Sequence, residues 1–181
     1  LIISCACAFS YSLAGMNWFD AIVHAMSTVS AGGFANYDAS FGAENLRQAM
    51  APAIFFMALA GLPFSLLTML VLQGRIRPML RDPQPRLYFA LLLTFSAIIV
   101  IWHEAVVEPP VFDHIFHGIT ETTFNIVSVM TGTGFASTAY DTWGQPAVIV
   151  FLLATFMGGC AGSASCGMKM FRLEITAKAL V

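Results

Sequence analysis

Long apolar stretches alternate along this chain with short polar segments rich in glycine, serine and threonine. The longest apolar stretches run from residue 46 to 73 and from 87 to 107. As helices rising about 1.5 Å per residue, both are long enough to cross a hydrocarbon core of about 30 Å. We expect Pro63 to kink the first near its middle, as a structural kink rather than a hinge, because proline removes one backbone hydrogen bond. The pattern predicts two spanning helices.

Three further apolar stretches are shorter. Residues 1 to 14 resemble the end of a membrane helix whose start lies outside the sequence, as expected for an internal fragment. Residues 18–27 and 114–130 are predicted to be re-entrant half-helices that enter the membrane without crossing it. In the first of these, Asn17 suits the N-cap and Asp20 stands in the first turn, where a carboxylate complements the helix dipole.

A polar, glycine-rich segment follows each half-helix, at residues 28–34 and 131–136. Laying Gly32 on Gly134 places the two copies 102 residues apart and also lays Gly42 on Gly144. Glycine tolerates the dihedrals that turn successive carbonyls the same way, and such carbonyls replace the water around a cation. The segments are therefore predicted to be ion filters, although each alone would fit an ordinary turn.

The predicted coordinating groups are backbone carbonyls, those of Gly32 and Gly134 above all, with the hydroxyls of Ser30, Thr131 and Thr133 as further candidates. The full set is Val29, Ser30, Ala31, Gly32, Thr131, Gly132, Thr133 and Gly134.

The last apolar stretch, residues 146–181, is interrupted at residues 158–167. The apolar residues before the interruption cover only about 18 Å as a helix, so the break is expected near the bilayer midplane, beneath the filter. Irregular backbone at that depth is tolerated where it is buried in protein or lines a water-filled path. We predict a gate formed by Gly158, Gly159, Cys160, Ala161, Gly162, Ser163, Gly167 and Lys169. The alternative is that Gly158 and Gly162 form a GxxxG pair for close helix packing.

Composition agrees with a membrane protein in contact with lipid, since 58% of the residues are hydrophobic and 10% are charged. A soluble domain has about 25% charged residues. Seven of the eight basic residues fall in segments 74–86 and 168–181, which the positive-inside rule places in the cytoplasm, and no basic surface for nucleic acid is left. Eight of the ten acidic residues fall on the side of the filters, where they would attract cations.

Other chemistry finds little support. The cysteines Cys5, Cys7, Cys160 and Cys166 lie in apolar or small-residue runs and are expected to pack rather than to form disulfides. The four histidines share no metal-ligand spacing, and neither Ser163 nor Ser165 has the flanking glycines of a hydrolase elbow. We therefore expect no enzyme activity and no bound cofactor.

Three motifs, at residues 24–34, 128–136 and 158–169, resemble the Trk/Ktr/HKT superfamily of potassium transporters, and most of all the bacterial Trk-type membrane subunit. The resemblance covers essentially the whole chain. It implies four helix–loop–helix repeats around one pore, of which this chain would supply the second and third. It also implies potassium uptake across the bacterial inner membrane, with potassium as substrate, a homodimer of full-length subunits, and a cytosolic nucleotide-binding regulatory subunit. Channel-like conduction and symport both stay open.

Some residues depart from the family's usual pattern. Ala31 and Gly132 stand where threonine is usual, which keeps carbonyl coordination but leaves the preference for potassium over sodium open. Pro63 stands where asparagine is common, and Ala164 and Cys166 replace a usual threonine and glycine.

The predicted fold is an all-α polytopic membrane protein built from tandem helix, re-entrant pore-loop, helix repeats, as in potassium channels. One repeat covers residues 1–73, a cytoplasmic loop covers 74–86, and the second repeat covers 87–181. The alternative function is a secondary transporter that binds another substrate at the ends of the broken helix.

Overall fold

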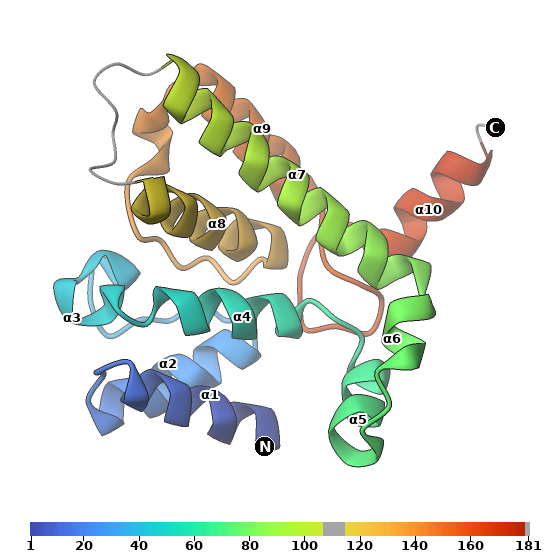
Figure 1. Ribbon diagram of the computed structural model, residues 1–181, viewed down its shortest axis with the longest axis horizontal. Helices are drawn as coiled ribbons and strands as arrows, with labels where there is room; N and C mark the ends of the chain where they lie inside the picture. The colour runs from blue at the N-terminus through green and yellow to red at the C-terminus, as the bar shows by residue number, and fades with distance from the viewer. Residues whose placement is uncertain (107–114, 180–181) are drawn as a thin grey trace.

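The computed structural model describes residues 1–106 and 115–179. Within these ranges helices are joined by loops, and there is no strand, only one isolated bridge between Met157 and Met168. Figure 1 shows two three-helix units lying one above the other, and in each unit the three helices contact one another. The helices are α1 (Ile2–Leu13), α2 (Trp18–Val29) and α4 (Met50–Ala60) in the first unit, and α7 (Pro83–Val106), α8 (Ile115–Thr131) and α9 (Gln145–Phe156) in the second. Helices α4 and α8 join the units. This confirms the predicted all-α repeats.

The half-helices α2 and α8 form as the sequence indicates. Asn17 is the N-cap of α2, and its side chain accepts a hydrogen bond of 2.9 Å from the backbone N–H of Asp20. Helix α2 continues to Val29, two residues beyond the predicted end, and α8 ends at Thr131. The predicted start of the second half-helix at residue 114 and the end of a spanning helix at residue 107 lie outside the described residues.

The predicted helix over residues 46–73 is wrong as one continuous helix. The chain forms the short helix α3 (Glu44–Arg47), then α4, then α5 (Phe64–Gln73), and α4 and α5 meet at 111°. Pro63 has extended backbone and no N–H to continue the ladder, so it ends the helix where the sequence suggested only a kink. Helix α4 thus ends after 11 residues, and α9, the corresponding helix of the second unit, ends after 12.

The predicted cytoplasmic loop 74–86 is partly helical. It contains α6 (Arg77–Arg81), and α7 begins at Pro83, four residues before its predicted start. Proline is tolerated in the first turn, where its missing N–H has no partner to lose. Among the described helices, α7 is the one long and apolar enough to cross a membrane by itself, and α4 with α5 would count as another if taken as one bent span. The chain ends in α10 (Met170–Ala179).

An aromatic cluster fastens the two repeats together behind the polar segments. Phe41, in the 3-10 helix η1 (Ser40–Gly42), lies 5.0 Å from the ring of Phe124 and 4.8 Å from that of Phe135. The ring of His24 meets Phe41 edge-on at 5.6 Å, and all four side chains are fully or almost fully buried. Large apolar side chains also cover the outside, as lipid contact requires, including Phe55, Leu93, Ile101, Leu152 and Phe156.

Candidate functional site

The two polar segments share an unusual backbone. In the first, Ala31 and Gly33 have positive φ angles of 53° and 70°, and in the second, Gly132 and Gly134 have 72° and 84°. Alternation of left-handed residues with ordinary ones turns successive carbonyls towards the same side, which is the requirement for a carbonyl-lined filter. Coordination of an ion by these carbonyls remains a prediction.

This geometry corrects the alignment of the repeats. The sequence paired Gly32 with Gly134, whereas the left-handed positions pair Ala31 with Gly132 and Gly33 with Gly134, a spacing of 101 residues instead of 102. Gly33, missed by the prediction, is therefore the counterpart of Gly134. The signal was in the sequence, because Phe34-Ala35 and Phe135-Ala136 are also 101 residues apart.

The two segments touch. A Cβ atom built on Gly33 would overlap the carbonyl oxygen of Thr133, so the backbones are in direct contact there. Nearby, the backbone N–H of Ala136 donates to Oγ of Ser40 at 3.3 Å. The structure thus brings the two predicted filters together as parts of one site.

The hydroxyl groups proposed as ion ligands are used within the protein. Thr131 Oγ1 donates to the carbonyl of Val127 at 2.8 Å, which leaves Thr133 as donor in the 2.8 Å contact between the two threonine hydroxyls. Ser30 Oγ donates to the carbonyl of Ser27 at 3.3 Å. These side chains brace the segments, and the backbone carbonyls remain the better candidate ligands.

The irregular segment 158–167 lies against the first residues of the second filter, Thr131 and Gly132. The backbone N–H of Cys166 donates to the carbonyl of Thr131 at 3.2 Å, and a Cβ on Gly132 would come within 2.8 Å of Cys166 Cβ. In Figure 1 the segment is the orange-red loop beside the ends of α4 and α8. The segment therefore contacts the second filter, while its expected depth near the bilayer midplane stays a prediction.

The backbone at the break near Pro63 forms hydrogen bonds with the backbone of segment 158–167. The N–H groups of Cys160 and Ala164 donate to the carbonyls of Gly61 and Ala60 at 2.8 and 3.2 Å, and Phe64 N–H donates to the carbonyl of Gly162 at 2.9 Å. These bonds supply partners that the interrupted helix ladders have lost, which is the condition for irregular backbone at membrane depth. The sequence indicated a kink at Pro63, but neither the complete break nor its pairing with the second break.

Side chains hold segment 158–167 in its fold. The ammonium of Lys169 donates to the carbonyl of Ser165, and it lies 3.4 Å from Ser163 Oγ. Ser165 Oγ accepts from the N–H of Gly159 at 2.9 Å, and Ser163 Oγ donates to the carbonyl of Cys160 at 2.7 Å.

The remaining predicted gate residues join the same cluster. Ala161 N–H donates to Gln84 Oε1 on α7 at 3.1 Å, which ties the segment to the first helix of its own three-helix unit. Gly158 and Gly167 approach so closely that a Cβ on either would meet backbone of the other, and Gly167 has a φ of 79°. Gly162 also has a positive φ, of 73°. The eight predicted gate residues thus belong to one segment that hydrogen bonds and close backbone contacts hold in place.

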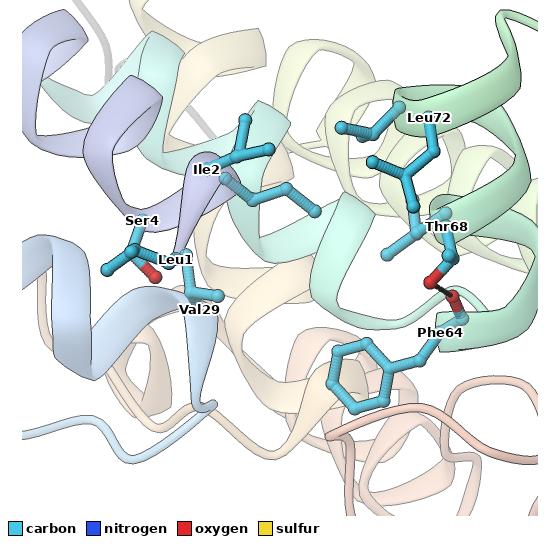
Figure 2. Close-up of a pocket in the computed structure, with 10 residues that line it drawn as sticks. Leu1, Ile2, Ser4, Val29, Phe64, Thr68 and Leu72 are labelled. Carbon is cyan, nitrogen blue, oxygen red and sulfur yellow. Dashed lines mark hydrogen bonds between the residues drawn. The ribbon is translucent and has the colours of Figure 1, made fainter.

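An apolar cavity of about 340 Å³ opens beside the first filter, between the start of α1 and helix α5 (Figure 2). Val29, the last residue of α2, lines it together with Phe64, directly after the Pro63 break. The other lining residues are Leu1, Ile2, Ile3, Ser4, Leu67, Thr68, Val71 and Leu72. None of these side chains is charged, so the cavity offers no selective anchor for a charged organic substrate at this helix break.

The chain is similar to cation transport proteins along its whole length. A family model described as TrkH, cation transport protein, matches residues 1–181. The Trk system potassium uptake protein TrkI of Halomonas elongata is 43% identical over 169 residues, covering 93% of this chain and 33% of the relative. The Trk system potassium uptake protein TrkG of Escherichia coli is 34% identical, covering 98% of this chain and 36% of the relative.

A solved structure shares the arrangement. The crystal structure of the potassium transporter TrkH from Vibrio parahaemolyticus matches with a TM-score of 0.86 and 28% identity, over 98% of this chain and 39% of that one. The chain therefore spans about a third of the length of the curated relatives it matches.

Proposed function

This chain belongs to the TrkH family of cation transport proteins, and from that premise we propose that it forms two of the repeats around a potassium pathway. It is part of a multi-pass protein of the bacterial inner membrane. The full-length protein takes up potassium through a filter to which Ala31–Gly33 and Gly132–Gly134 contribute backbone carbonyls. The function is transport and not catalysis of a covalent step.

One observation carries this proposal: two polar segments 101 residues apart in the sequence have the same alternating left-handed backbone and lie in contact. Left-handed conformations are costly for residues with a side chain, and such cost is kept where function requires it. Carbonyls fixed in a row replace the hydration shell of a cation without reorganising.

Segment 158–167 is the gate of this proposal. It contacts Thr131 and Gly132 at the inner end of the filter, and it is held by hydrogen bonds that a modest displacement would break. Because α4 and α5 pair with it, the Pro63 break would move with it. Lys169 fastens its second half, so loss of the ammonium should favour the displaced state.

The likeness to Trk system proteins extends the proposal to assembly. The full-length subunits would form a homodimer in the lipid bilayer and bind a cytosolic nucleotide-binding regulatory subunit, whose movement would be passed to the gate. Potassium is the substrate and no resident cofactor is required.

Growth at limiting potassium tests the function. An uptake-deficient bacterial strain would express the full-length parent, either unchanged or carrying Gly134→Ser, with its regulatory subunit. We expect the parent to restore growth and Gly134→Ser to weaken the rescue or shift transport towards sodium, since serine at a φ of 84° is strained. A parent that reaches the membrane with its regulator and gives no rescue would contradict potassium uptake and favour transport of another substrate.

The gate is tested separately by Lys169→Met, which keeps the length of the side chain and removes its charge. We expect a higher basal potassium flux and weaker control by the regulatory subunit. The matched control is Lys178→Met on α10, whose ammonium pairs with Glu174 on the same helix. Equal flux in both variants and the parent would show that the segment does not limit flux.

A further inference from the structure

Two buried carboxylates lie behind the filters, one in each half-helix. Asp20 of α2 is 4% exposed and Glu121 of α8 is 0% exposed, although carboxylates are rarely buried without a purpose. They are 101 residues apart, the same spacing that relates Gly33 to Gly134. The two acids therefore occupy equivalent places in the repeats.

Asp20 holds the segment that leaves the first filter. Its carboxylate accepts hydrogen bonds from Asn36 Nδ2 at 2.7 Å and from the hydroxyl of Tyr37 at 2.8 Å. It also accepts from Asn17 Nδ2, at 2.7 Å, on the N-cap of the half-helix. The bond to the carboxylate raises the pKa of Tyr37 above its ordinary value. One carboxylate thus ties the outer end of the filter to the start of α2.

Glu121 makes the equivalent connection in the second repeat. Its carboxylate accepts from Ser137 Oγ at 3.4 Å, and Ser137 is the counterpart of Asn36 at the 101-residue spacing. Asn125, one turn further along α8, adds two bonds to Ser137: its Nδ2 donates to Ser137 Oγ at 2.8 Å and its Oδ1 accepts from Ser137 N–H at 3.2 Å. Different side chains therefore produce the same attachment in both repeats.

This attachment complements the one at the inner end of the second filter. Segment 158–167 holds Thr131 and Gly132 there, while Ser137 and its partners hold the chain just beyond Phe135. A backbone with left-handed residues relaxes unless its surroundings fix it at both ends. Small changes in carbonyl positions matter because ion discrimination depends on the number and placement of the carbonyls.

We propose that Asp20 and Glu121 are positioning residues that hold the outer ends of the two filters, and thereby set the preference for potassium over sodium. The inference rests on the proposed function, because it concerns the selectivity of the same filter. The residues act through Asn36, Tyr37 and Ser137, and do not themselves coordinate the ion. Loss of their hydrogen bonds, rather than loss of their negative charge, should alter selectivity.

The chain offers matched controls for charge. Asp38 and Asp141 are exposed acids in the segments that follow the two filters. Among the described residues, neither carboxylate forms a hydrogen bond with a filter segment. Asp38→Asn and Asp141→Asn remove one negative charge from the outer side, as Asp20→Asn and Glu121→Gln do. The controls leave the attachments of the filters in place.

The experiment measures the potassium-to-sodium permeability ratio of the full-length parent and these four variants in proteoliposomes. In Asp20→Asn and Glu121→Gln an NH2 donor replaces one of the two acceptor oxygens, so we expect each variant to lower the ratio by about tenfold. Asp38→Asn and Asp141→Asn should keep the parent's ratio. An unchanged ratio in folded Asp20→Asn and Glu121→Gln overturns the inference, as does an equal fall in all four variants.

Two further variants cover the case in which a buried acid cannot be replaced without loss of folding. Tyr37→Phe and Ser137→Ala remove one donor to each carboxylate and leave the carboxylate itself in place. Both should lower the ratio in the same direction by a smaller factor, and an unchanged ratio in both overturns the inference. A parent that carries no potassium flux would instead refute the proposed function, so the two failures are distinguishable.

Discussion

Gly32 and Gly33 are adjacent, yet the structure predicts that alanine is tolerated at Gly32 and disrupts the filter at Gly33. A Cβ on Gly33 would overlap the carbonyl oxygen of Thr133, and the residue has a φ of 70°. A Cβ on Gly32 would meet side-chain atoms, Ser30 Oγ at 3.3 Å and Phe34 Cδ2 at 3.4 Å, and Gly32 is not among the residues with positive φ. Side chains move aside more easily than backbone.

The cost of Gly33→Ala has two parts. The left-handed conformation costs about 1–2 kcal/mol for a residue with a side chain, and forcing an extra methyl group into a packed contact costs about 1–3 kcal/mol. The sum of roughly 2–5 kcal/mol reduces the population of intact filter by more than about tenfold, at about 1.4 kcal/mol per factor of ten. Gly32→Ala requires only adjustment of a serine and a phenylalanine.

The assay is initial potassium uptake by cells expressing the full-length parent, normalised to the amount of monodisperse protein extracted from the membrane. We expect Gly32→Ala to retain most of the uptake and Gly33→Ala to lose at least about nine tenths of it, which is the tenfold effect worked out above. The reverse ranking would refute the reasoning, because it would restore the alignment of Gly32 with Gly134.

Three other predictions concern single positions. Ala31→Gly should raise the melting temperature, by an amount equivalent to about 1 kcal/mol, because glycine adopts a φ of 53° without strain. Uptake should be kept, since glycine already occupies the equivalent position 132. A lower melting temperature would show that Ala31 is unstrained. Gly61→Ala should destabilise the protein by about 1–3 kcal/mol relative to the parent, because its Cβ would lie 2.5 Å from the hydroxyl of Tyr88. A melting temperature equal to the parent's would contradict this packing. A charged thiol reagent applied from the cytoplasmic side should react with the exposed Cys166 and lower potassium flux. Cys166→Ser should abolish this inhibition, whereas Cys160→Ser should not, since Cys160 is buried. Persistent inhibition of Cys166→Ser would place the reactive thiol elsewhere.

Local signals predicted the half-helices and the broken helix well. Asn17 caps α2 because its side chain reaches the Asp20 N–H, which is a contact within one turn that the sequence displays directly. The interruption of α9 followed from the run of small residues after Met157, and α9 ends at Phe156. Such features depend on neighbours in the sequence, so a pattern of residues is enough to find them.

Features that depend on distant contacts were missed. Pro63 looked like a kink because a single proline usually bends a helix, but segment 158–167 supplies partners for the free carbonyls of Ala60 and Gly61 and so stabilises a complete break. The alignment slipped by one residue because Gly32 and Gly33 are both glycine, and only the backbone angles distinguish them. The role of Glu121 needed the fold, since Ser137 lies 16 residues away from it.

We propose that these two segments belong to one potassium-selective filter. The experiment to make first compares potassium and sodium flux through the purified full-length parent in proteoliposomes with flux through a Gly33→Ala, Gly134→Ala double variant, which alters both equivalent positions. We expect flux that favours potassium in the parent, and loss of that preference in a double variant that is still folded. A parent that conducts both ions equally, or a folded double variant with the parent's preference, would contradict it.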